Sequence, residues 1–148
     1  EYQDALLGLR GHPEFELVGH FHPAAPDVEK FWRNAGVRTL DTFQQVLREA
    51  AVYVTDNSST LYEFTSLDRP VVVLNSRHYR RDVEHGPRFW RHAYVGPQVW
   101  SPERLELAIM TQLQEPKAYH ARRTAATREL YPHRGRATAT AIQWLETL

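Results

Sequence analysis

Two groups of polar side chains in this sequence have types and spacing suited to binding a phosphate. The first is the turn Thr55-Asp56-Asn57-Ser58-Ser59, which separates a short apolar run from a helical pattern. The second is His22, which stands directly before Pro23 at the end of another apolar segment. Hydroxyl and backbone N–H groups at the beginning of a helix donate to anions, and an imidazole donates to phosphate or transfers a proton. The residues therefore indicate a site for a phosphorylated ligand.

The turn lies inside a pattern typical of a βαβ unit. Val52 to Val54 and Val71 to Leu74 are continuous apolar runs, as expected for parallel strands covered on both faces. Between them apolar residues recur at helical spacing, at Leu61, Tyr62, Phe64 and Leu67. A right-handed crossover puts the turn at the carboxyl edge of the sheet, where open α/β sheets bind ligands. We expect Ser58, Ser59 and Thr60 to bind phosphate there, and ordinary capping of the helix by these side chains is the alternative.

His22 is predicted to lie on the same rim of the sheet. Phe15 to Phe21 has the pattern of a strand, and Pro23 cannot continue a ladder, so the strand ends beside the imidazole. His22 is therefore the candidate catalytic residue, acting as a general acid or base or donating to phosphate. A histidine bonded to nearby backbone at a strand end is the alternative. A zinc site shared with His20 lacks an acidic or cysteine partner, so no metal is expected.

The rest of the chain continues the alternation of helices and strands. We expect helices over residues 2–9, 27–34, 41–50, 101–114, 116–130 and 136–148, and a minimal strand over 37–39. Asp41 is the expected cap of the third helix. The last helix is expected to bury an apolar face made of Ala137, Ala141, Trp144 and Leu145. These elements predict an α/β fold, a Rossmann-like three-layer parallel sheet with helices on both faces.

Residues 76–96 form the longest irregular stretch, and such a stretch in a compact domain usually has a function. Five arginines cluster there beside aromatic residues, a combination that clamps phosphates or stacks on a base. A solvated surface loop is the alternative.

Composition narrows the class of protein. The 148 residues suffice for one domain with a substantial core, and 18 basic residues balance 18 acidic ones. No general attraction to nucleic acid or membranes is therefore expected. There is no cysteine, and no apolar run approaches the roughly 18 residues of a membrane helix. We expect a soluble, cytoplasmic domain.

Because a βα protein usually begins with a strand, we also expect a first strand or a whole preceding domain outside this sequence.

Several short motifs occur in a recognisable order. A strand ends in His-Pro, a later strand runs into Thr-Asp-x-Ser-Ser and a helix, and Arg-Pro-Val-Val-Val, a basic loop and Gly-x-Ala follow. This order resembles the CDP-glycerol glycerophosphotransferase family, the teichoic-acid polymerases and primases. The likeness spans about Leu17 to Trp144 and is strongest from Ala51 to Leu74. It implies that residues 1–148 are a single Rossmann-like domain, the carboxyl-terminal nucleotide-binding half of a two-domain GT-B transferase.

The resemblance also implies roles for individual residues. His22 matches a histidine that acts on the pyrophosphate of the donor, and Ser58 and Ser59 match a serine pair that holds donor phosphate. The further residues expected to contact donor phosphate are Thr60, Arg134 and Arg136. Those expected near the donor nucleotide are Asp56, Glu63 and Asn75.

The expected function is binding of a nucleotide-diphosphate donor, CDP-glycerol or a nucleotide sugar, for transfer of a glycerophosphate or glycosyl group to an acceptor hydroxyl. No cofactor beyond this substrate nucleotide and no metal is expected. The acceptor and any catalytic base are expected to lie in an amino-terminal domain outside this sequence, and the resemblance implies that the full-length enzyme is cytoplasmic or peripheral on the inner face of the membrane. The alternatives are half of a UDP-sugar 2-epimerase-like enzyme and a non-catalytic binding module of the same fold.

Overall fold

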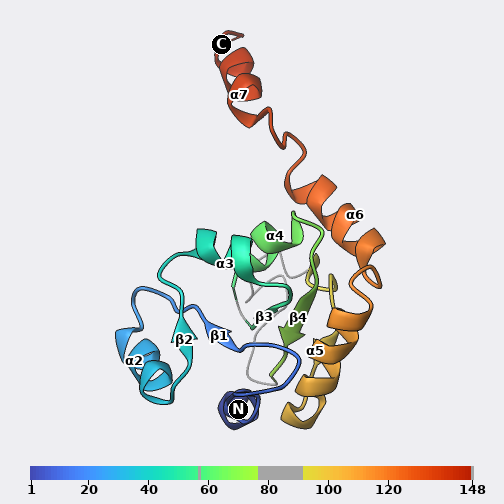
Figure 1. The fold of residues 1–148 in the computed structure, drawn as a ribbon. Helices are drawn as coiled ribbons and strands as arrows, with labels where there is room; N and C mark the ends of the chain where they lie inside the picture. The colour runs from blue at the N-terminus through green and yellow to red at the C-terminus, as the bar shows by residue number, and fades with distance from the viewer. Residues whose placement is uncertain (57, 77–91, 148) are drawn as a thin grey trace.

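The chain folds as a mixture of helices and short parallel strands, so the predicted α/β class is confirmed (Figure 1). This computed structural model describes residues 1–56, 58–76 and 92–147. The strands of this part of the chain are β1 (Val18–Gly19), β2 (Arg38–Thr39), β3 (Tyr53–Thr55), β4 (Val71–Leu74) and β5 (Gln98–Val99). They form two groups, a β1–β2 pair and a sheet in the order β3-β4-β5, and each pairing is parallel.

The predicted βαβ unit lies at the centre of the fold. β3 pairs with β4 in the register Tyr53↔Val71 to Thr55↔Val73, and α4 (Thr60–Thr65) connects them. β5 pairs with the other side of β4. Every residue of β4 is buried, as its continuous apolar run predicts. Because the three strands are parallel, their carboxyl ends lie at one edge of the sheet.

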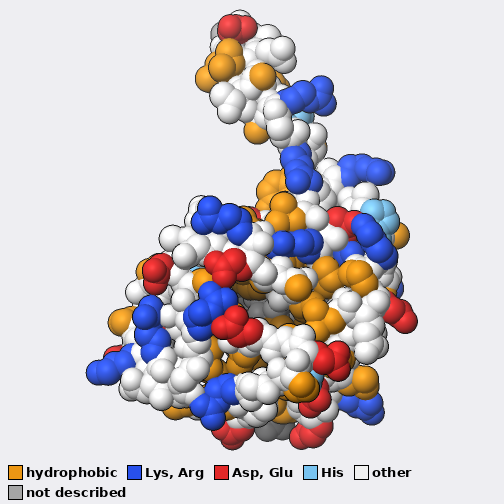
Figure 2. Space-filling view, viewed as in Figure 1, with side chains coloured by type: hydrophobic (Ala, Val, Ile, Leu, Met, Phe, Trp, Pro, Cys, Tyr) orange, Lys and Arg blue, Asp and Glu red, His pale blue; other side chains and the backbone are white. Residues whose placement is uncertain are grey.

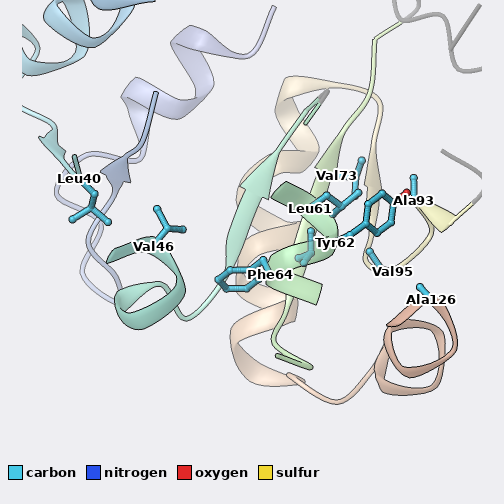
Figure 3. Close-up of a cluster of buried hydrophobic side chains, with 10 residues drawn as sticks. Leu40, Val46, Leu61, Tyr62, Phe64, Val73, Ala93, Val95 and Ala126 are labelled. Carbon is cyan, nitrogen blue, oxygen red and sulfur yellow. The ribbon is translucent and has the colours of Figure 1, made fainter. Parts of the chain in front are cut away.

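Buried side chains cover both faces of β4. Val71 and Val73 belong to a cluster that also contains Leu61, Tyr62 and Phe64 of α4 (Figure 3). Val72 and Leu74 belong to a second cluster, whose other members are Tyr2, Leu9, Val99, Leu105 and Ile109. Side chains alternate across a strand, so the single run Val71–Leu74 supplies the centre of both clusters.

Helices form where the sequence predicts them, with small changes at their ends. Beside α4 they are α1 (Gln3–Gly8), α2 (Pro26–Asn34), α3 (Phe43–Glu49), α5 (Leu105–Gln114), α6 (His120–Leu130) and α7 (Ala137–Leu145), and a 3₁₀ turn, Pro102–Arg104, precedes α5. The cap of α3 is Thr42, so the prediction of Asp41 is wrong. Thr42 and Gln45 bond each other's backbone N–H groups in a capping box, which places the cap one residue later.

The strand predicted over Phe15–Phe21 is reduced to Val18–Gly19. Its only partner in the described chain is β2, which is also two residues long. A strand extends only as far as another strand pairs with it. β2 ends at Thr39, shortly before α3 begins, so β1 has no partner beyond that point. The aromatic ring of Phe15 stacks on His12 instead, with 4.2 Å between ring centroids.

The prediction that α7 buries Ala137, Ala141, Trp144 and Leu145 is wrong. Trp144 is 73% exposed and Leu145 69%, and no residue of α7 is buried. Gly135, with a φ of 75°, lies in the turn before α7, and the helix points away from the body of the molecule (Figure 1). Hydrophobic side chains are visible on its surface (Figure 2). Helical spacing identified the apolar face but carries no information about a surface to cover it.

Gly96 allows the backbone that leads into β5 to approach β4 closely. A Cβ atom at this position would lie 1.8 Å from the carbonyl oxygen of Val71. Only glycine fits such a close approach without movement of the backbone.

Replacing Gly96 with alanine should lower the free energy of unfolding by about 2 kcal/mol or more, because the added methyl group forces β4 and β5 apart. Urea denaturation followed by circular dichroism measures the change. Gly8→Ala is the matched control, since a Cβ atom there meets nothing within 4 Å. That variant should be neutral or slightly stabilising. Equal effects of the two substitutions would show that the close approach does not constrain the sheet.

An ion cluster attaches α6 to the end of α4. The carboxylate of Asp68 accepts from Arg123 Nε at 2.9 Å, from Lys117 Nζ at 3.2 Å, and bonds His120 Nδ1 at 2.6 Å. Arg123 is fully buried, and its Nη2 also donates to the carbonyl oxygen of Pro116. Burial acts to raise the pKa of Asp68, but the hydrogen bonds from His120, Arg123 and Lys117 outweigh it, so the pKa is lowered.

Asp68→Asn should lower the free energy of unfolding by about 3 kcal/mol at pH 7, because it leaves the buried Arg123 without a counter-charge. Asparagine tolerates the φ of 55° at this position, so the backbone is not strained. The matched control is Lys117→Ala, which removes a side chain that is 78% exposed and should cost less than about 1 kcal/mol.

The effect of Asp68→Asn should also depend on pH. A lowered pKa in the folded state contributes stability that is complete above the unfolded value of about 3.9 and is lost as the pH falls through the folded pKa. The difference between the two proteins should therefore close below about pH 4. A difference that stays constant from pH 7 to pH 3 would contradict the ion-pair account.

Candidate functional site

The loop after β3 is held by a chain of hydroxyl groups. Tyr53 Oη lies 2.8 Å from Thr60 Oγ1, which lies 2.7 Å from Ser58 Oγ. The backbone N–H of Thr60 also donates to Ser58 Oγ at 3.3 Å. Ser59 is the N-cap residue of α4 but makes no side-chain capping bond, and it is exposed. Ser58 and Thr60 therefore fix the shape of the loop, while Ser59 presents its hydroxyl group at the surface.

The phenol of Tyr53 stays protonated near neutral pH. Burial raises its pKa, and the negative charges of Asp56 and Glu63 add to the rise, although hydrogen bonds to Thr60 and Thr55 oppose it. Asp56 and Glu63 are exposed. Both predicted donor-vicinity carboxylates therefore act on the same tyrosine that anchors the loop.

Asn75 lies at the carboxyl end of β4, at the predicted edge of the sheet. Its Nδ2 donates to Gln98 Oε1 at 3.0 Å, and its backbone N–H donates to the carbonyl oxygen of Val99 at 2.7 Å. Tyr2 Oη lies 2.7 Å from the carbonyl oxygen of Asn75 and 2.8 Å from that of Val99. Asn75 therefore ties the ends of β4 and β5 to the amino-terminal segment.

His22 is exposed and belongs to the β1–β2 part of the fold. Its Nδ1 accepts from the backbone N–H of Ala24 at 3.1 Å, and its carbonyl oxygen accepts from Ala25. Bonding to nearby backbone was one of the two alternatives predicted for this residue. Because Nδ1 accepts, the proton of the neutral ring is on Nε2. No hydrogen bond joins His22 to Ser58, Ser59 or Thr60 in the described part of the chain.

His20, the neighbour considered for a zinc pair, packs against Phe43 with 5.7 Å between ring centroids. Burial lowers the pKa of His20, so its ring is neutral near pH 7, although Glu29 opposes the shift. Over residues 1–56, 58–76 and 92–147, no group of three or more His, Cys, Asp or Glu residues is arranged to hold a metal ion.

The two predicted arginines do not lie beside the serine loop. Arg134 Nη1 donates to the carbonyl oxygen of Ser66 at 2.6 Å, and Ser66 is the C-cap residue of α4. Ser59 begins that helix, so roughly 10 Å of helical rise separates the two ends. Arg136 is exposed and is the N-cap residue of α7, which projects from the body (Figure 1). The structure therefore separates Arg134 and Arg136 from Ser58, Ser59 and Thr60.

The arginine-rich stretch predicted to clamp phosphates falls on residues 77–91, which lie outside the described residues. Of the predicted loop over 76–96, the structure describes Ser76, which is buried, and the residues from His92 onward.

The sequence patterns do not indicate an open groove of about 410 Å³ between β5 and α5. Trp100, Arg104, Gln112 and Tyr119 are among the residues that line it. β5 itself was not predicted, because Gln98–Val99 is too short for a periodic pattern. A signal for Gln112 was present, since this polar residue follows Leu105 and Ile109 on the apolar stripe of the predicted helix.

Comparison of the chain with protein-family models, with curated proteins and with solved structures found no match. None of the helices in the described ranges is long and apolar enough to cross a membrane.

The hydroxyl chain makes a testable contribution to stability. Thr60→Val keeps the shape of the side chain but leaves Tyr53 Oη and Ser58 Oγ without their shared partner, and should lower the free energy of unfolding by about 1–2 kcal/mol. Thr60→Ser retains the hydroxyl group and is the control, with a smaller loss. Chemical denaturation measures both. If the valine variant were as stable as the serine variant, the hydroxyl chain would not hold the loop.

Proposed function

We propose that this chain is the donor-nucleotide-binding domain of a transferase of the CDP-glycerol glycerophosphotransferase or GT-B glycosyltransferase kind. The reaction transfers a glycerophosphate or glycosyl group from a nucleotide-diphosphate donor to an acceptor hydroxyl. The observation that carries the proposal is the parallel β3-α4-β4 unit, with the Ser58–Thr60 loop and Asn75 following its two strands. Ligands of open α/β sheets bind at this edge. A three-layer Rossmann-like arrangement is part of the same proposal.

In this scheme the serine loop binds the pyrophosphate of the donor. Ser59 donates its exposed hydroxyl group, while Ser58 and Thr60 hold the loop in place. Charge develops on the leaving pyrophosphate as the bond to the transferred group breaks, and fixed donors stabilise it. His22 would donate from Nε2 to the same pyrophosphate. This role requires the β1–β2 pair to present His22 to the ligand at the edge of the β3-β4-β5 sheet.

A non-catalytic binding module of the same fold is the second candidate. It is favoured by the contacts of Arg134, which donates to Ser66 at the far end of α4. It is also favoured by the bonds that Ser58 and Thr60 make to each other.

Thermal unfolding of the chain with CMP, CDP, UDP and GDP separates the candidates. A ligand that binds only the folded state stabilises it by about 2.7 kcal/mol at a concentration of 100 Kd, so the unfolding temperature should rise with concentration. The transferase proposal predicts the largest rise with CDP and no turnover by this chain alone. The largest rise with UDP would indicate the UDP-sugar epimerase alternative, and no rise with any nucleotide would indicate the binding module.

Three variants locate the pyrophosphate. Ser59→Ala should weaken CDP binding about tenfold, through loss of a hydrogen bond to a charged group. His22→Ala should weaken it by a similar factor. Glu63→Gln should strengthen it, because a negative charge near the anion is removed. The control is Ser66→Ala, at the opposite end of α4, which should leave the affinity unchanged. Isothermal titration calorimetry measures the four constants, and indifference to Ser59→Ala and Glu63→Gln together would refute the proposed site.

A further inference from the structure

α7 carries an apolar face that no described residue covers. Ile142, Trp144 and Leu145 are all exposed, and no residue of the helix is buried. Figure 2 shows hydrophobic side chains gathered on this helix, which projects from the body of the molecule (Figure 1). Exposed apolar side chains that gather in one place mark a surface on which a partner packs. The helix therefore presents a docking face.

The open groove between β5 and α5 has the character to receive such a helix. Trp100, which directly follows β5, and Leu107 of α5 line it, and they are 63% and 58% exposed. Pro97 and Ala108 add further apolar surface. An amphipathic helix binds a partner by laying its apolar face in a groove of this kind. The same chain thus exposes both halves of a helix-in-groove contact.

The two helices match in length. α5 has ten residues and α7 has nine, so they rise about 15 Å and 14 Å. Ala137, Ala141 and Trp144 follow one another at the i, i+4 and i+7 spacing by which a docked helix anchors itself. α7 can therefore lie along the whole of α5.

Charges at the helix ends select an antiparallel orientation. α5 runs from Arg104 at its N-cap to Glu115 at its C-cap, and α7 runs from Arg136 to Glu146. Each charge has the sign that the dipole of its own helix disfavours. Antiparallel packing places Arg136 beside Glu115 and Glu146 beside Arg104, so each of the four gains an opposite charge.

Two other carboxylates near Arg104 lie outside this contact. Glu106 Oε1 lies 3.6 Å from His12 Nε2, and Glu103 is not among the described residues that line the groove. Arg104 does line it. The charge that faces the end of a docked α7 is therefore positive.

α7 of the same copy is poorly placed to fill its own groove. α6 separates α5 from the turn over 131–136, and its 11 residues rise about 16 Å. Beyond this turn α7 points away from the body (Figure 1). A second copy brings its α7 to the groove without this restriction. We propose that α7 of one copy docks antiparallel to α5 in the groove of a second copy, which returns the contact with its own α7.

Reciprocal docking closes a dimer, because each copy holds one helix and one groove. A tryptophan side chain buries about 150–250 Å², whereas a specific interface buries about 1,200–2,000 Å² in total. A single contact centred on Trp144 is therefore small, and the reciprocal pair doubles the buried area. We expect a dissociation constant in the micromolar range.

Sedimentation equilibrium of residues 1–148 from micromolar to millimolar concentration tests the dimer. Trp144→Ala and Leu107→Glu should each weaken association at least about 30-fold, as expected for side chains at the centre of an interface. Both side chains are exposed, so circular dichroism should show both variants folded. Val28→Glu, which changes an exposed aliphatic residue of α2, is the matched control and should leave association unchanged.

Charge reversal tests the antiparallel orientation. Glu115→Arg and Arg136→Glu should each weaken association about threefold or more. Combining both in one chain should restore it, because the two residues meet across the contact. Each reversal improves the charge at the end of its own helix, so a loss of association cannot come from a weaker helix. A double variant that associates no more tightly than the single variants would contradict this orientation.

A chain that sediments as a monomer at every concentration would overturn the proposal. So would a dimer that is indifferent to Leu107→Glu, since pairing of α7 with α7 does not use the groove. Amide hydrogen exchange supplies a second readout, because docking covers α7. Its amides should exchange more slowly as the protein concentration rises, and rates independent of concentration would contradict docking.

Discussion

The fold depends on the burial of one strand on both faces and along both edges. β4 pairs with β3 on one side and with β5 on the other, and all four of its side chains are buried. Its odd and even residues supply different clusters, so helices on both sides of the sheet pack on one short run of apolar residues. Gly96 lets the third strand approach closely enough to complete this arrangement.

Around this strand, polar groups divide into those that hold the structure and those without a side-chain partner among the described residues. Tyr53, Ser58 and Thr60 satisfy one another, as do Asn75 and Gln98. Ser59 presents a hydroxyl at the surface, and Gln112 buries an amide that nothing in the described chain satisfies. A ligand gains most from an exposed group of the second kind, such as the hydroxyl of Ser59, because pairing it costs no internal bond. Several residues that the sequence indicated for the site hold the structure instead. The candidate site therefore contains fewer residues than predicted.

The sequence predicted the positions of the helices and strands better than it predicted which strands pair and which surfaces pack together. The apolar run Val71–Leu74 and the turn before Thr60 identified the βαβ unit, since these are local patterns with a fixed period. The unpredicted β5 and the shortened β1 are set by pairing between distant segments. The apolar face of α7 was visible in the sequence, yet its burial depends on whether distant segments pack on it, and none of the described residues buries it. Arg134 was expected at the phosphate, and the path of the chain brings it to Ser66 instead.

The exposure of α7 has a consequence for the exchange of backbone amide protons with solvent. A helix of nine residues without a packed face has little beyond its own hydrogen bonds to hold it, and such short helices open readily in water. Its amides should exchange through local fraying, whereas those of β4 should exchange only when the whole domain opens. We therefore expect protection against exchange to fall along the carboxyl-terminal half of this chain, from β4 at the centre of the sheet to α7.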